Sequence, residues 1–96
     1  ALKHDRRGTI AWCLVGLAEL ETLRNQPKKG ARLLGVAEAM PELYVFYWSY
    51  DRLELEQISG TIRAQLDEAV FKNEQEVGRQ MTLDEAVDYA LKELQQ

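Results

Sequence analysis

Apolar residues along this chain recur three and four positions apart, which is the spacing of one face of an α-helix. The pattern predicts about five helices, which span residues 8–25, 27–40, 51–66 and 68–80, with a fifth that starts at Thr82. No alternation of apolar and polar residues, the pattern of a half-buried β-strand, accompanies these stretches. The expected fold class is therefore all-α.

Local signals mark several of the helix ends. Proline disfavours the helical conformation in the residue before it, so Pro27 is expected to stop the first helix near Asn25 and to open the second. Pro41 is expected to end the second helix. Thr82 and Glu85 have the spacing of a capping box, in which each side chain bonds the backbone amide of the other residue.

The same periodicity predicts which side chains form the core. Gly60 lies within the predicted third helix, where glycine costs about 1 kcal/mol relative to alanine, so we expect a close helix contact or a kink there. The expected core residues are Ile10, Trp12, Leu14, Val15, Leu17, Ala18, Leu20 or Glu21, Leu23, Leu33, Leu34, Val36, Ala37, Met40, Leu55, Ile58, Ile62, Leu66, Val70, Phe71, Val77, Leu83, Ala86, Val87, Ala90, Leu91 and Leu94.

The first two helices carry part of a tetratricopeptide pattern. Trp12, two residues, a large aliphatic residue and then Gly16 match the first helix of that repeat. Gly16 is expected to let the second helix approach closely. The second helix offers Ala31, Gly35 and Glu38 at the spacing where such a helix presents small residues, although a glutamate fits this role poorly.

One helix pair of this kind cannot bury its own hydrophobic face, because such repeats are stabilised by stacking on neighbours. We therefore expect one domain over residues 1–96 in three parts. An antiparallel tetratricopeptide-like pair spans residues 8–40, an aromatic connector spans residues 41–50, and a three-helix cap spans residues 51–96.

Three blocks of the chain resemble a known family segment. Ala31–Met40, Leu66–Phe71 and Gly78–Leu91 are similar to the C-terminal tetratricopeptide-like tail of large bacterial regulators, which are STAND-type ATPases often linked to LuxR-type outputs. The similarity covers roughly residues 8–40 and 62–91. It implies the terminal, capping part of a bacterial signalling or transcriptional regulator.

Two features depart from that family pattern. The connector over residues 41–50 is aromatic here, whereas the family segment is usually rich in proline, alanine and arginine. A tyrosine common early in the third helix is replaced by Leu55. The resemblance implies a role in the parent protein and no particular ligand.

Composition agrees with one soluble domain. The 96 residues are 46% hydrophobic and 29% charged, which argues against disorder. No apolar run is long enough to span a membrane and no signal peptide is visible. A lone cysteine is compatible with a reducing cytoplasm, so we expect a cytoplasmic location. Because the chain begins at Ala1 without a methionine, we expect it to be a fragment of a longer protein.

Charge is unevenly distributed along the chain. Residues 1–50 hold seven Lys and Arg against five Asp and Glu, whereas residues 51–96 hold five against eleven. An acidic second half argues against direct binding of nucleic acid or of an anionic membrane, which require clustered positive charge. The one basic cluster is expected to be a solvated helix end, and it comprises Arg24, Lys28, Lys29 and Arg32.

The chain shows no catalytic or metal-binding pattern, so we expect no enzyme activity and no cofactor. Cys13 lacks a nearby base, because the one histidine, His4, lies nine residues away in a charged leader expected to fray. Cys13 is therefore expected to pack in the first helix. The paired carboxylates are interpreted as solvated faces or a helix cap.

The stretch from Tyr44 to Tyr50 holds five of the eight aromatic residues of the chain. Three roles are open: packing against the chain's own helices, a protein interface, or a small-ligand site. The candidate interaction residues are Trp12, Tyr44, Tyr47, Trp48 and Tyr50. The preferred function is a non-catalytic protein-interaction module that binds upstream repeats of its own chain or a second copy. The alternative is a ligand-sensing domain with a pocket lined by these aromatic side chains.

Overall fold

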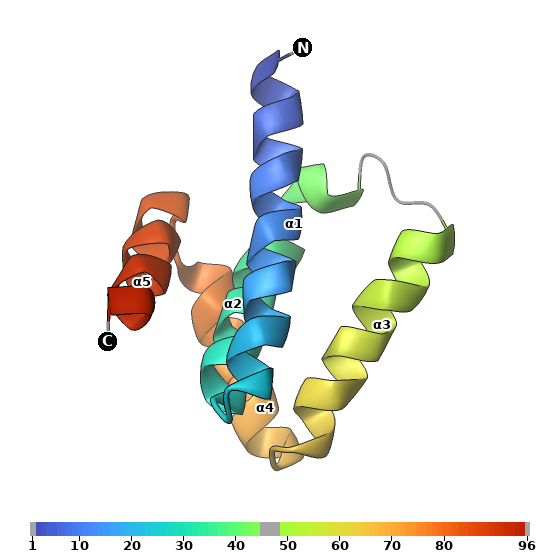
Figure 1. The fold of residues 1–96 in the computed structure, drawn as a ribbon, viewed down its shortest axis with the longest axis vertical. Helices are drawn as coiled ribbons and strands as arrows, with labels where there is room; N and C mark the ends of the chain where they lie inside the picture. The colour runs from blue at the N-terminus through green and yellow to red at the C-terminus, as the bar shows by residue number, and fades with distance from the viewer. Residues whose placement is uncertain (1, 45–48, 96) are drawn as a thin grey trace.

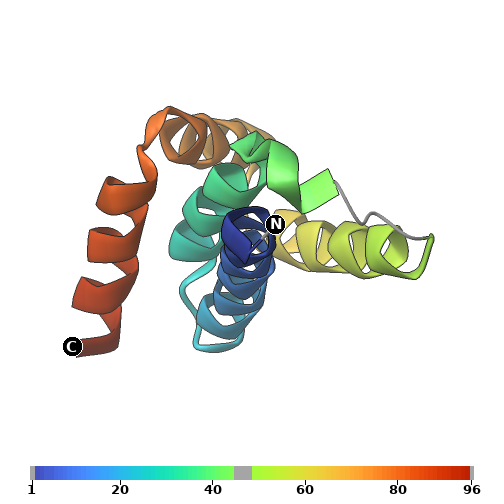
Figure 2. The same ribbon diagram turned by 90° about the horizontal axis from the view of Figure 1, so that it is seen from above.

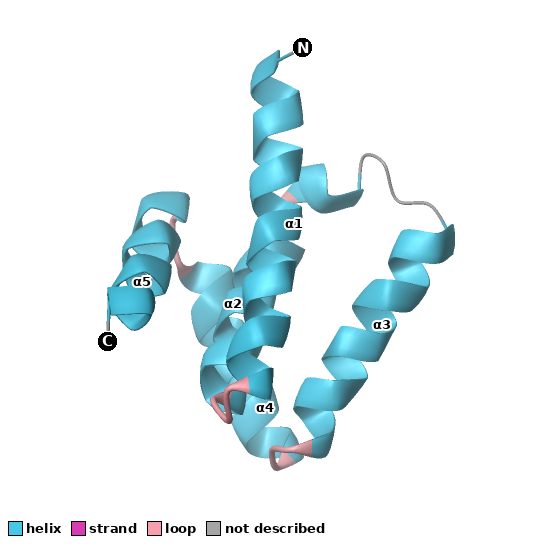
Figure 3. Ribbon diagram, in the orientation of Figure 1, coloured by secondary structure: helices cyan, strands magenta, loops and turns pink. Residues whose placement is uncertain are grey.

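The computed structural model describes residues 2–44 and 49–95. In these ranges the chain is helical apart from short turns and contains no strand, which confirms the all-α class and the expected number of helices (Figures 1 and 3). The elements are α1 (Leu2–Leu23), α2 (Pro27–Ala39), the 3₁₀ helix η1 (Pro41–Tyr44), α3 (Ser49–Ala64), α4 (Glu68–Gln80) and α5 (Leu83–Gln95).

Helix α1 begins at Leu2, well before the predicted start at Gly8. The leader that contains His4 is thus part of a helix rather than a segment outside it. The side chain of Arg7 donates from Nε to Oε2 of Glu42 over 2.8 Å. This ion pair connects the first turns of α1 to η1, a link between distant parts of the sequence that periodicity does not reveal.

The turn between α1 and α2 follows the Schellman pattern of helix ends. Asn25 has a left-handed backbone with a φ of 71°. Its amide donates to the carbonyl of Thr22 over 3.1 Å, and the amide of Gln26 donates to the carbonyl of Glu21 over 2.8 Å. Pro27 then opens α2. The chain reverses here, so α1 and α2 form an antiparallel hairpin (Figure 1).

The capping box at the start of α5 is confirmed. The amide of Glu85 donates to Oγ1 of Thr82 over 3.1 Å, and the amide of Thr82 donates to Oε1 of Glu85 over 2.8 Å. Two amides at the helix start, which have no partner within the helix, are satisfied in this way.

Helix α2 is the centre of the molecule. Its most extensive contacts are with α1 on one side and with α4 on the other, and Figure 2 shows it between these two helices. Helix α3 flanks α1 and α2, and α5 contacts α2 from the opposite side (Figures 1 and 2). The three later helices contact the α1–α2 hairpin more than they contact one another.

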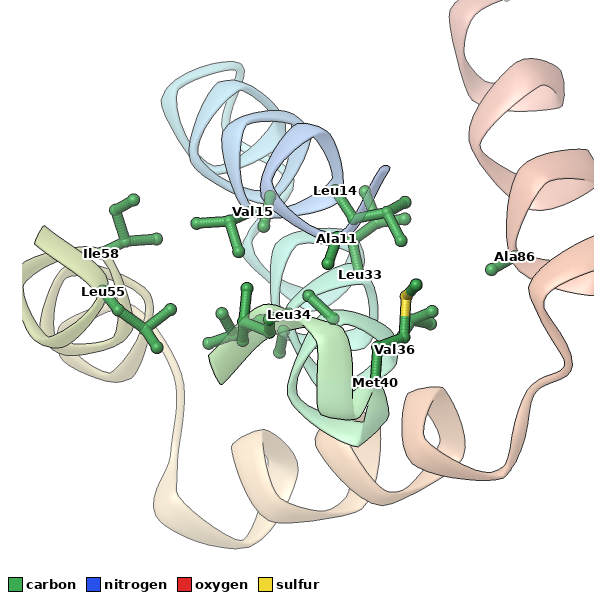
Figure 4. Close-up of a cluster of buried hydrophobic side chains, with 14 of the residues drawn as sticks. Ala11, Leu14, Val15, Leu33, Leu34, Val36, Met40, Leu55, Ile58 and Ala86 are labelled. Carbon is green, nitrogen blue, oxygen red and sulfur yellow. The ribbon is translucent and has the colours of Figure 1, made fainter. Parts of the chain in front are cut away.

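The core lies around α2. Figure 4 shows Leu55 and Ile58 of α3 directed toward the hairpin, and Ala86 of α5 directed toward it from the other side. The buried apolar residues are Ala11, Leu14, Val15, Ala18, Ala31, Leu33, Leu34, Val36, Ala37, Met40, Leu43, Leu55, Ile58, Ile62, Phe71, Ala86 and Ala90.

The glycine contacts differ from those expected. Gly16 is exposed, and a Cβ added there would meet nothing within 4 Å. The close approach of α1 and α2 occurs instead at Gly30, whose added Cβ would lie 2.8 Å from the carbonyl oxygen of Ala18. Gly60 also faces open space in an unbroken α3, so the expected close helix contact there is wrong.

Gly35 does mediate a close helix contact, but the partner is α4 rather than α1. A Cβ on Gly35 would lie 3.0 Å from the carbonyl carbon of Gln75. Glu38 likewise faces α4, where its Oε1 accepts a hydrogen bond of 2.6 Å from Nε2 of Gln75. The small-residue face of α2 is therefore turned toward α4.

Several residues expected in the core are exposed, namely Leu23, Val77, Val87 and Leu91, and the side chain of Leu94 lies outside the described residues. In α1 the residue that is buried is Glu21, at 3% exposure, in place of Leu20 at 44%. The inward face of α1 is centred on Ala11, Leu14 and Ala18, so Leu23 lies outside the contact with α2.

Candidate protein-interaction surfaces

Of the five candidate interaction residues, the structure describes the surroundings of one. Trp12 is half-buried and packs against the core cluster from α1. Tyr44 ends η1 and Tyr50 lies in the first turn of α3, but their side chains, like all of Tyr47 and Trp48, lie outside the described residues. The three roles of the aromatic connector therefore stay open.

The expected basic cluster does not form one solvated patch. Arg32 pairs with Glu74 of α4, with Nη2 and Nε at 2.7 and 2.9 Å from the same Oε1. The guanidinium of Arg32 also lies over the ring of Tyr89 in α5, 5.1 Å from the ring centre. Arg32 thus connects α2 to both α4 and α5. The expectation of a solvated helix end is wrong for this residue.

Helix α5 packs two alanines, with the half-buried Leu83 and Tyr89, against the rest of the molecule and leaves two larger apolar residues exposed. Ala86 and Ala90 are buried against the rest of the molecule, whereas Val87 and Leu91 are 39% and 50% exposed. Val87 and Leu91 are one helical turn apart, so they form a short apolar strip, which we call the α5 strip. The apolar face of α5 is thus wider than the surface that the hairpin covers.

A groove lies between α1 and α3. It is an open pocket of about 380 Å³, lined by Glu19, Leu53, Glu54, Gln57, Ile58 and Thr61. We call it the α1–α3 groove. Ile58 is buried, whereas Leu53 is 55% exposed. Among the described residues no aromatic side chain lines this groove.

The charge in the α1–α3 groove is negative. Glu19 and Glu54 face it from opposite helices, and neither makes an ion pair within residues 2–44 and 49–95. Gln57 and Thr61 add an amide and a hydroxyl group. The groove thus combines an apolar floor with two carboxylates that have no cationic partner in the described chain.

The turn of the α1–α2 hairpin carries positive charge, in contrast to the groove. Leu23 is 74% exposed, and it is followed by the exposed cations Arg24 and Lys28. Arg24 uses Nη1 to bind the buried Glu21 over 2.9 Å, which leaves its other donors available. We call residues 23–28 the hairpin tip. It presents one large apolar side chain, Leu23, together with two positive charges.

Sequence reasoning did not identify the groove or the tip. One signal was present: Glu54, Gln57 and Thr61 follow helical spacing, so they were recognisable as one polar face of α3. Leu53 beside that face is an apolar exception. The tip was missed because periodicity alone predicts that Leu23 is a core residue, whereas its side chain is exposed.

The remaining reactive or metal-ligating side chains that the structure describes do not form a catalytic or metal site. Cys13 is exposed rather than packed as expected. Among the described residues no group of three or more His, Cys, Asp or Glu side chains is arranged to hold a metal ion. Of the helices in the described part of the chain, none combines the length and the apolar character required to cross a bilayer.

Comparisons with protein-family models, with curated proteins and with solved structures find no match.

Proposed function

We propose that the chain is a non-catalytic protein-interaction and scaffolding module, the terminal helical-repeat part of a cytoplasmic bacterial regulator of signalling or transcription. The observation that carries the proposal is the α5 strip, Val87 and Leu91. Apolar side chains of this size at adjacent turns of one helix are typical of a surface that contacts another helix.

The free energy available at the strip is modest but useful. Fully burying a valine or leucine side chain contributes about 1.5–3 kcal/mol. Val87 and Leu91 are already partly covered, so a partner that covers the rest gains about 1 kcal/mol from each. Such a strip favours association with a protein that supplies further contacts, for example the preceding repeats of a helical array.

The layering of helices supports the same proposal. Helices α1, α2 and α4 lie side by side in that order (Figure 2), and stacking of this kind is how helical repeats extend. The resemblance of Ala31–Met40 and Gly78–Leu91 to the tail of STAND-type regulators supports the terminal position. On this proposal the partner is either the upstream repeats of the same protein or a second copy.

A site-specific photocrosslink tests the proposal. Benzoylphenylalanine is placed at position 91 in the cells that express the protein, and at the exposed position 73 of α4 as the control. We expect a crosslinked protein at Leu91 that is missing at Asn73 and is reduced by Val87→Asp. Mass spectrometry identifies the protein; repeats of a STAND-type or LuxR-type regulator, or the chain itself, support the proposed context. Equal or no crosslinking at both positions contradicts it.

A further inference from the structure

The α1–α3 groove and the hairpin tip are complementary in charge and in apolar character. The groove offers Glu19 and Glu54 beside a floor that includes Ile58. The tip offers Arg24 and Lys28 beside Leu23. Lys28 makes no ion pair within the residues that the structure describes. The negative charges of the groove and the positive charges of the tip are therefore complementary, and each surface also carries an apolar side chain.

We propose that the α1–α3 groove of one chain receives the hairpin tip of a second copy, so that two chains form a reciprocal dimer. The proposal specifies a partner for the interaction module and rests on that proposed function. In the dimer, Leu23 of each chain enters the groove of the other, and Lys28 and Arg24 lie beside the carboxylates of Glu19 and Glu54.

The positions of the two surfaces suit a two-fold arrangement. Glu19 and Leu23 are one helical turn apart on α1, so the groove and the tip lie on the same side of that helix. The C-terminal ends of α1 and α3 lie at the same end of the long axis of the molecule (Figure 1). When two copies of α1 cross there, each tip faces the other groove, as an isologous interface requires.

Gly16 adds to this geometry. It lies one turn before Glu19, is exposed, and would meet nothing within 4 Å if it carried a Cβ. Glycine in a helix interior normally destabilises the helix, and nothing within the described chain uses this one. In the proposed dimer it leaves the backbone of α1 accessible to the helix of the other copy.

The proposed interface is small, so the dimer is expected to be weak and concentration-dependent. Sedimentation equilibrium over a range of protein concentrations measures it. The groove variant carries Glu19→Lys and Glu54→Lys. The tip variant carries Gln26→Glu and Lys28→Glu, at the exposed N-cap and in the first turn of α2, where acidic residues suit the helix dipole. Arg24 is left intact because it neutralises the buried Glu21.

We expect the wild-type mass to rise with concentration toward that of a dimer. Each variant alone should dimerise roughly tenfold more weakly or worse, since groove and tip then carry the same sign of charge. An equimolar mixture of the two variants should recover association, because each groove again meets a tip of opposite charge. The control, Glu76→Lys with Asp88→Lys, changes net charge by the same amount as the groove variant, at exposed positions on α4 and α5, and should dimerise like the wild type.

Leu23→Ser provides a second variant that leaves all charges in place. Leu23 is 74% exposed, so the fold should persist while dimerisation weakens. The proposal is overturned if the wild type stays monomeric, if the groove and tip variants dimerise as well as the control, or if their mixture fails to associate. If the wild type is monomeric but still crosslinks to another protein from position 91, the proposed dimer is contradicted and the proposed function is not.

Discussion

Gly35 of α2 and Gln75 of α4 meet backbone to backbone, with no side chain between them. A Cβ on Gly35 would lie 3.0 Å from the carbonyl carbon of Gln75, and a Cβ on Gly78 would lie 2.9 Å from that of Arg32. Each helix thus contributes one glycine to the same crossing. The contact between α2 and α4 depends on the absence of both methyl groups.

Gly35→Ala is therefore expected to destabilise the protein. The added methyl group meets backbone atoms, which cannot rotate away, so the helices must separate. Overpacking of this kind costs about 1–3 kcal/mol and occasionally more. Urea unfolding followed by circular dichroism measures the loss, and Gly78→Ala should behave in the same way. An unchanged unfolding midpoint in both variants would show that α2 and α4 do not cross at these glycines.

Gly60→Ala is the matched control and should have the opposite effect. Gly60 lies inside α3, and an added Cβ meets nothing within 4 Å. Replacing glycine by alanine in a helix interior stabilises by about 0.5–1 kcal/mol when no clash is introduced. The same urea measurement should give a higher midpoint. A lower midpoint would mean that Gly60 contacts a part of the molecule that the described residues do not include.

Arg32→Lys tests the connection between α2, α4 and α5. Lysine keeps the charge but loses both the paired contacts to Glu74 and the planar stacking on Tyr89. We expect a loss of about 1 kcal/mol in the free energy of unfolding. Hydrogen exchange followed by NMR should show the largest loss of protection in α5, which otherwise contacts α2 only lightly. Arg79→Lys, at an exposed position of α4, is the control, and a uniform effect across all helices would contradict the role of Arg32.

Thr82→Ala removes the hydroxyl of the capping box. The amide of Glu85 then loses its acceptor, and loss of such a cap typically costs about 1 kcal/mol. Thr61→Ala is the control, because the Thr61 hydroxyl donates to the carbonyl of Gln57 in an exposed part of α3 and its removal should change stability by less than about 0.5 kcal/mol. Thermal unfolding measures both. Equal effects of the two substitutions would argue against the cap.

The helices themselves were largely predictable, because their signals are local. Pro27 and Pro41 act on the residues beside them, and the bonds between Thr82 and Glu85 form within one turn. The start of α1 at Leu2 was missed because residues 3–7 are charged or polar and add no apolar position to the helical stripe. The ion pair from Arg7 to Glu42 joins residues far apart in the sequence, so periodicity does not reveal it either.

The interaction surfaces were less predictable. Periodicity identifies an apolar face but not how much of it a neighbour covers. Leu23 and Leu91 belong to regular stripes and are nevertheless exposed, because α2 covers only part of α1 and of α5. Periodicity allowed either Leu20 or Glu21 to face the core, and the structure buries Glu21. Which of the two is buried depends on the line along which α1 meets α2.

The sequence by itself determined an all-α chain, the ends of α2, and the cap of α5, since each depends on interactions within a few residues. Only the tertiary structure decided that Gly35 faces α4, that Gly16 faces solvent, and that an acidic groove and a basic tip lie on one side of α1. These features depend on the directions in which rigid helices cross. Many crossings are compatible with the same helical pattern, and long-range packing selects one of them.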